Sequence, residues 1–292
     1  MLKRNNIINN LTGYLFILPA SLLLLIFVVY PLAANIYNSF HSWNLISSAK
    51  FIGARNFITL FQSSEFYITL KNTLLYPLII IPSVLVTGFI LAYFIQRPGK
   101  LNVLYRTVYF IPRVTSMVAM SSVWLFLYNP QYGFLNTLLI HLGLSGVRWL
   151  NEPSSALVSV AIIIIWRTIG YATVLFLTGL QNIPSSVIEA AELDGISGMR
   201  RVLCIELPLV SPTSFMLLIL TTIDSLKLFT TIDVMTQGGP AGSTQNLVVM
   251  LYKYGFLKYQ IGYASTVSIV LFLIIFAVNL IQMRLEKKVV YD

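Results

Sequence analysis

Apolar residues in this chain gather in long runs rather than in short alternating stretches. A run of about 20 apolar residues can cross the ~30 Å hydrocarbon core of a bilayer as an α-helix, because each residue rises about 1.5 Å. Such runs predict six membrane-spanning helices, at residues 11–37, 69–96, 103–128, 154–180, 207–232 and 264–283. The alternation typical of membrane β-strands is missing. The pattern predicts an all-α, polytopic membrane protein with one transmembrane domain over residues 1–292.

Composition narrows the class further. Of the 292 residues, 57% are hydrophobic and 10% charged, whereas soluble domains carry about 25% charged residues. The net charge of +9 also occurs in polytopic proteins, which collect Lys and Arg in cytoplasmic loops. The single cysteine, Cys204, excludes an internal disulfide or a multi-cysteine metal site, and we expect no metal. An ordinary soluble enzyme, a disordered protein and a nucleic-acid binder are therefore excluded.

Basic residues also predict the orientation. Most loop Lys and Arg share a side with the N-terminus, so we expect both termini in the cytoplasm. These residues are Lys3, Arg4, Arg97, Lys100, Arg106, Arg200, Arg201, Arg284, Lys287 and Lys288. The first apolar run is much longer than the ~7–15 residues of a signal-peptide core, and we expect it to be a retained anchor.

The cytoplasmic loop at 184–206 is predicted to form two short helices. Pro184 and Ser185 suit a helix start, and Gly195 suits the left-handed position that ends a helix. Ser197 can cap a second helix at 199–206. Such a hairpin is either an ordinary amphipathic loop or a segment that docks in a groove of a partner.

A family resemblance favours docking. The segment Glu189-Ala-Ala-Glu-Leu-Asp-Gly195, followed by Ile205-Glu-Leu-Pro208, resembles the EAA signature of binding-protein-dependent ABC importer permeases. Further matching segments place the similarity in the carbohydrate-uptake branch, near the maltose and glycerol-3-phosphate permeases: Asn72-Thr73, Phe110–Pro112, Trp166 to Gly170, Gly179–Pro184 and Thr236–Pro240. Ile196 departs from the alanine often found there. The resemblance implies the type I importer permease fold.

The family's architecture implies this chain's partners. A solute-binding protein outside the cell would deliver solute to this chain and a second, homologous permease in the bacterial inner membrane, and two ATP-binding cassette subunits would supply energy. The loop would be a coupling helix that contacts the ATPase through Glu189, Ala190, Ala191, Leu193, Asp194 and Gly195. This chain lacks the phosphate-binding loop motif. We therefore expect no enzyme activity of its own, with ATP and Mg bound by the partner ATPase and no cofactor here.

Charged residues inside spans are candidates for the solute pathway, because such groups normally face a cavity or a partner. The pathway candidates are Trp166, Arg167, Tyr171, Asp224, Lys227 and Phe229. Alternatively, Asp224 pairs with Lys227 or Arg167 and only joins helices, and we expect Arg113 to serve packing or to reach the membrane surface. Aromatic faces favour a sugar, polyol or glycoside. The excess of basic groups leaves a glycerol-phosphate-type anion as the alternative solute.

The last external loop contains Gly238, Gly239 and Pro240. These residues break helices, and the resemblance implies that they also border the docking surface of the binding protein. Rival functions have less support. An ion-coupled secondary transporter usually has internal repeats and buried carboxylates, but no repeat is visible and Asp224 is the only acid deep in a span. A membrane-embedded enzyme or a purely structural subunit are weaker alternatives, since no paired carboxylates accompany the two histidines.

Overall fold

The computed structural model describes residues 2–96 and 102–289, and almost all of this backbone is helical. The chain divides into two compact units, which are described separately. The first unit comprises Met1–Ser63 and Leu251–Leu271, and the second comprises Ser64–Met250 and Phe272–Asp292. Arg97 and Lys100, which contribute to the expected charge asymmetry, lie outside the described residues.

The first unit begins with a long apolar helix. It consists of α1 (Leu2–Leu24), a π-helical turn η1 (Leu25–Val29) and α2 (Tyr30–Ser39). Its candidate membrane span, Gly13–Ser39, has an apolar window of which nothing is buried inside the chain. Apolar side chains that face outward in this way suit contact with lipid tails or with another membrane protein.

A small polar region follows that helix. A two-stranded antiparallel ladder pairs β1 (His41–Ser42) with β2 (Lys50–Phe51), and α3 (Arg55–Gln62) comes next. The start of α15 (Ile261–Val289) packs here after the turn η3 (Lys253–Leu257). A Cβ atom on Gly262 would overlap the carbonyl of His41, so glycine permits the close approach of these two segments.

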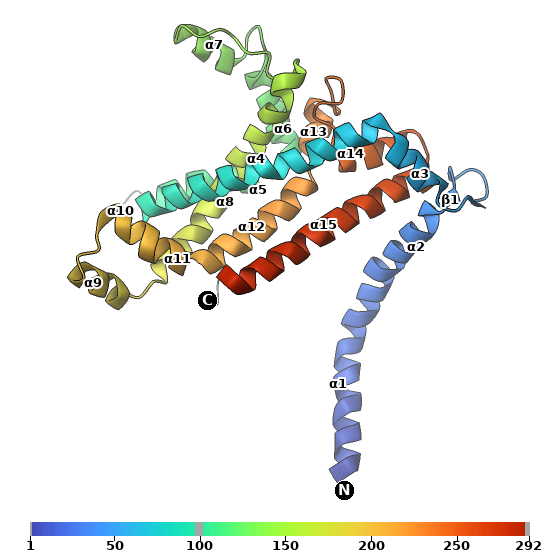
Figure 1. Cartoon of the computed structure of the whole chain (residues 1–292), viewed down its shortest axis with the longest axis horizontal. Helices are drawn as coiled ribbons and strands as arrows, with labels where there is room; N and C mark the ends of the chain where they lie inside the picture. The colour runs from blue at the N-terminus through green and yellow to red at the C-terminus, as the bar shows by residue number, and fades with distance from the viewer. Residues whose placement is uncertain (1, 97–101, 290–292) are drawn as a thin grey trace. The chain divides into compact units, whose positions relative to one another are not determined.

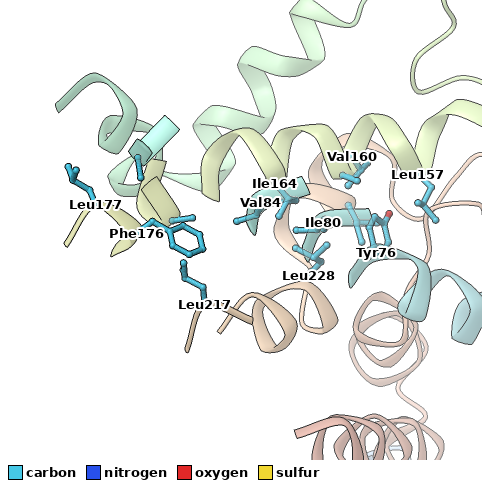
Figure 2. Packing of buried hydrophobic residues seen from close by; sticks show 14 of the residues in the cluster. Tyr76, Ile80, Val84, Leu157, Val160, Ile164, Phe176, Leu177, Leu217 and Leu228 are labelled. Atoms are coloured by element: carbon cyan, nitrogen blue, oxygen red, sulfur yellow. The ribbon is translucent and has the colours of Figure 1, made fainter. Parts of the chain in front are cut away.

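The second unit is a helical bundle around α4 (Ser64–Ile95) and α8 (Pro153–Gln181), the pair with the most extensive contact. Around them lie α5 (Asn102–Val114), α6 (Met117–Leu127), α12 (Ser211–Leu226) and the end of α15, with α7 (Phe134–His141) beside α6. Figure 2 shows Ile80 and Val84 of α4 beside Val160 and Ile164 of α8, all four of them buried. Burial of such side chains is the main favourable term in the packing of this core.

Short helices occupy the ends of this bundle (Figure 1). At one end lie α9 (Ser185–Leu193) and α10 (Gly198–Arg201), followed by the π-helical turn η2 (Val202–Glu206) and α11 (Leu207–Leu209). At the other end lie α13 (Thr230–Met235) and the start of α14 (Leu247–Tyr252). A cis peptide bond joins Gly239 and Pro240 between them.

Two of the predicted spans are bent. Among the described residues, four helices are long and apolar enough to cross a membrane, and the number is six if each bent helix pair is one span. The span expected at 103–128 is α5 and α6, which meet at 100°, and the span expected at 207–232 begins within a 66° bend between Gly198–Leu209 and Ser211–Leu226. The hydropathy pattern that predicted these spans did not indicate the bends. Ser116 is extended (ψ 128°) at the first break, and helical hydropathy alone does not reveal such a residue.

One helix crossing in this unit depends on a glycine. A Cβ atom added to Gly170 of α8 would overlap the carbonyl oxygen of Tyr109 in α5. The two backbones therefore approach more closely than any side chain would permit, as is common where membrane helices cross at small residues. Gly170 fixes where α5 lies along α8, and this in turn places the bend that follows α5.

Candidate functional site

A polar cavity of about 400 Å³ lies within the second unit. It is formed where three structural features meet: the bend between α5 and α6, the middle of α8, and the non-helical connection between α12 and α13. The lining residues are Arg113, Met117, Ile164, Arg167, Thr168, Asp224, Lys227, Leu228, Phe229, Thr230 and Thr231. Its volume is within the usual range for small-molecule sites, about 300–1,000 Å³.

Local backbone geometry brings these residues together. Lys227 ends α12, and Phe229 precedes α13 with a non-helical conformation (φ −136°, ψ −67°). On the opposite side, the Thr115 hydroxyl donates a hydrogen bond to the carbonyl of Ile111 (2.9 Å) next to the break at Ser116. Such side-chain bonds compete with regular helix. Both breaks therefore turn polar side chains toward a shared space.

An ion pair crosses the cavity. Arg113 Nη2 lies 3.3 Å from Asp224 Oδ2, and the guanidinium carbon of Arg113 lies 4.9 Å from the centre of the Tyr171 ring. Arg167 Nη2 donates a hydrogen bond to the backbone oxygen of Arg113 (3.1 Å). Asp224 therefore pairs with Arg113, and not with Lys227 or Arg167, the partners named in the alternative to a solute contact. Arg113, which was expected to serve packing or to reach the membrane surface, joins α5 to α12 through this ion pair and also lines the cavity.

The six candidate pathway residues have different positions. Four of them, Arg167, Asp224, Lys227 and Phe229, line the cavity together. Tyr171 lies one turn after Arg167 on α8, and the guanidinium of Arg113 lies over its ring. Trp166 does not line the cavity: it is 44% exposed, and its ring packs edge-on against that of Trp124.

The prediction missed several lining residues: Arg113, Met117, Ile164, Thr168, Leu228, Thr230 and Thr231. Among them, only Arg113 carried a sequence signal, which was its charge within a span. The threonines carried none, since hydroxyl groups are common in membrane helices and usually bond to their own backbone. Their contribution depends on the two helix breaks.

The loop at 184–206 is folded as two short helices with a defined stop. Gly195 has φ +72°, its N–H bonds to the carbonyl of Glu192 (3.1 Å), and the N–H of Ile196 bonds to the carbonyl of Ala191 (2.8 Å). This pair of bonds is the Schellman motif, which requires a left-handed residue. The predicted stop at Gly195 is confirmed. Ser185 and Ser197 precede or begin helices, but neither side chain makes a capping hydrogen bond.

A charge cluster joins the two halves of this loop. Arg201 Nη1 donates to Glu192 Oε1 of α9 (2.9 Å), and Arg201 Nε donates to Glu206 Oε1 at the end of η2 (3.0 Å). Only 4% of the Glu206 side chain is exposed, against 59% for Glu192. Arg201 is therefore engaged within the chain.

The expected docking residues differ in exposure. Glu189, Ala190, Leu193, Asp194 and Gly195 are exposed, and Leu193 is 90% exposed. Ala191 is only 4% exposed, so its placement on an outward docking face was wrong. Leu193 is the most exposed of the large apolar side chains on α9, ahead of Val187 at 37%, so this helix has an outward-facing edge centred on Leu193.

Side-chain hydrogen bonds from α4 hold the loop that contains Gly238, Gly239 and Pro240. Asn72 Nδ2 donates to the carbonyls of Gly242 (2.8 Å) and Gln245 (3.0 Å), and the Tyr76 hydroxyl donates to the carbonyl of Thr244 (3.0 Å). These hydrogen bonds from buried side chains add to backbone bonds within the loop, such as those from the N–H of Gly239 to the carbonyl of Thr236 (2.8 Å) and from the N–H of Ser243 to the carbonyl of Pro240 (2.9 Å). The loop is therefore a defined surface at the end of the bundle opposite α9.

Comparison with known proteins gives one family. Residues 84–291 match the family described as "Binding-protein-dependent transport system inner membrane component". The chain is 35% identical over 284 residues to the "Probable ABC transporter permease protein YurN" of Bacillus subtilis, covering 96% of this chain and 97% of that protein. It is 33% identical over 279 residues to the "Sulfoquinovosyl glycerol transport system permease protein SmoG" of Agrobacterium fabrum, covering 95% and 91%.

A solved structure has the same fold. A chain in the crystal structure of a bacterial alginate ABC transporter, in complex with an alginate-bound periplasmic protein, superposes with a TM-score of 0.85. The two chains are 21% identical, and the match covers 98% of this chain and 97% of that one. Its helical arrangement is that of a type I importer permease, which agrees with the fold expected from the sequence.

Proposed function

We propose that this chain, which belongs to the family of binding-protein-dependent transport system inner membrane components, forms half of an ATP-driven import pathway for a carbohydrate-related solute. The chain is a multi-pass permease subunit of an ABC importer. It matches relatives named as transport permeases over nearly their whole length. A second, homologous permease would complete the pathway. Two ATP-binding cassette subunits would hold ATP and Mg on the cytoplasmic side, where both termini would also lie.

The observation that carries this proposal is the folded, outward-facing helix α9. Its exposed edge around Leu193 lies beyond the helical bundle, and the Schellman stop and the Arg201 cluster hold it in one conformation. A short helix held rigidly in this way suits insertion into a cleft of a partner. The partner would be the ATPase, and movement of its cleft would be transmitted through η2 to α12.

The other two sites would complete the cycle. The binding protein would dock on the outer loop that includes Gly238, Gly239 and Pro240, and the solute would pass through the polar cavity lined by Arg167 and Asp224. A sugar, polyol or glycoside suits the aromatic Phe229 and the hydroxyl groups of the lining. The basic side chains favour, as a second candidate, a solute of the glycerol-phosphate type.

The test is uptake by the whole complex in proteoliposomes. The chain is co-expressed with the permease, ATPase and binding protein from neighbouring reading frames, and uptake of the solute that the binding protein retains is followed. We expect uptake to require ATP inside the vesicles together with the binding protein outside. Uptake driven by an ion gradient without ATP would contradict the proposal, as would uptake that persists without the binding protein.

A further inference from the structure

We infer that the cavity binds an anionic group of the solute: a carboxylate, sulfonate or phosphate. The inference rests on the proposed function in one respect, namely that the solute passes through this cavity. It goes further by assigning a charge to the solute and by naming the side chains that recognise it: Arg167, Lys227 and Thr231, all of which line the cavity.

The charges around the cavity do not balance. Three basic side chains, Arg113, Arg167 and Lys227, line it against one carboxylate, Asp224. Asp224 is paired with Arg113. Among the residues that the structure describes, neither Arg167 nor Lys227 forms an ion pair. Arg167 is half-buried and Lys227 is exposed toward the cavity. Positive charges within the expected spans are costly without a counter-charge, so a bound anion would stabilise the site.

Hydrogen-bonding capacity is also left over. Nε of Arg167 is buried without a hydrogen-bond partner in the described part of the chain, and the same holds for the hydroxyl of Thr231. Thr231 is only 1% exposed. Buried polar atoms are nearly always satisfied, and an orphan in a site indicates a missing ligand or water. A guanidinium is a donor only, so the missing partner of Arg167 is an acceptor.

These two observations agree on the ligand chemistry. Arginine binds planar or tetrahedral oxyanions through several N–H groups, while lysine contributes a compact point charge. The hydroxyls of Thr168 and Thr230 and the ring of Phe229 complete the lining and suit the polar rim and apolar face of a small sugar-like body. A sugar acid or a phosphorylated or sulfonated polyol combines both features.

The test uses the assembled permease–ATPase complex in nanodiscs and measures its melting temperature. Sodium glucuronate is compared with glucose plus equal sodium chloride, because the two solutes differ mainly in the carboxylate. A ligand that binds only the folded state raises the melting temperature with its concentration. We expect glucuronate to raise it and glucose to raise it less at every concentration.

Variants locate the effect. Lys227→Gln should raise the glucuronate concentration needed for the half-maximal shift about tenfold, because it removes one charged contact. Lys227→Arg should restore most of the response. Thr231→Val, which keeps the shape and removes the hydroxyl, should weaken it less. Arg148→Gln is the matched control, since Arg148 is a mostly exposed basic residue that does not line the cavity.

Three results would overturn the inference: equal shifts with glucose and glucuronate, no shift with either, or a glucuronate shift that Lys227→Gln leaves unchanged. The last would indicate that glucuronate binds elsewhere in the complex. Failure here is separable from failure of the proposed function. A complex that imports a neutral solute with ATP but shows no glucuronate shift keeps the function and loses the anion site.

Discussion

Arg201 donates a hydrogen bond of 3.0 Å to the buried carboxylate of Glu206, whose second oxygen has no partner in the described part of the chain. The pair joins α10 to the end of η2, which leads through the short helix α11 into α12. A buried carboxylate with one charged partner depends heavily on that partner, because removing it leaves an uncompensated charge. Arg201 therefore offsets the free-energy cost of burying the Glu206 carboxylate at the start of this span.

Arg201→Gln should therefore destabilise the complex far more than Glu192→Gln. Loss of one member of a buried ion pair costs about 3–5 kcal/mol, whereas an exposed pair is worth about 0–1 kcal/mol. The measurement is the melting temperature of the purified complex. Adding Glu206→Gln to Arg201→Gln should recover part of the loss, because the double variant no longer buries a lone charge. Equal losses for the two single variants would contradict this assignment.

Gly195→Val should separate ATP hydrolysis from solute uptake. A β-branched residue at φ +72° carries strain of about 1–3 kcal/mol, although no neighbouring atom obstructs a Cβ there. The helix stop would open and α9 would lose its fixed direction. The measurement is the ratio of ATP hydrolysed to solute imported, which should rise. Gly195→Asn is the matched control, since asparagine tolerates this conformation, and an unchanged ratio in Gly195→Val would count against the role of the stop.

Gly170→Ala should weaken the packing of α5 on α8. The added methyl group would overlap the carbonyl of Tyr109, and overpacking of this kind costs about 1–3 kcal/mol. We expect a lower melting temperature and reduced uptake, because Arg113 lies in the last turn of α5. Gly146→Ala provides the control, since its new atom would lie 3.4 Å from the nearest neighbour, Asn136 Nδ2. Similar behaviour of both variants would show that the helix crossing has room to adjust.

Asn72→Asp should loosen the outer loop and weaken docking of the binding protein. The substitution puts carboxylate oxygens opposite the carbonyls of Gly242 and Gln245, where Asn72 now donates. Loss of these bonds costs about 1–3 kcal/mol. The dissociation constant between the binding protein and the complex should rise several-fold. Tyr76→Phe, which removes a single hydrogen bond to Thr244, should have a smaller effect in the same direction, and an unaltered constant in Asn72→Asp would exclude this loop from docking.

The sequence predicted best where hydropathy and local backbone chemistry decide the structure. The long runs that became α4 and α8 are examples, and so is the stop at Gly195, where the left-handed conformation favours one residue type. The three charged pathway candidates, Arg167, Asp224 and Lys227, share one cavity because a charge within a span has few stable positions.

The parts that could not be predicted depend on bends and long-range contacts. Hydropathy is the same for a straight span and for two helices at 100°, so the sequence did not indicate that Arg113 meets Asp224, 111 positions later. The sequence also did not indicate whether Ala191 or Leu193 is the exposed residue. Both lie on α9, and only the packing of the folded loop decides which of them faces outward.

The closed turn at the end of α9 also has a kinetic consequence. Its N–H groups are already bonded within the chain, so a protein that docks there meets a preformed surface and no segment has to fold during the encounter. Binding then loses little conformational entropy, and association is limited by diffusion and orientation rather than by a folding step. Subunits of the complex could therefore reassemble quickly, and the dissociation rate constant would determine how long they stay bound.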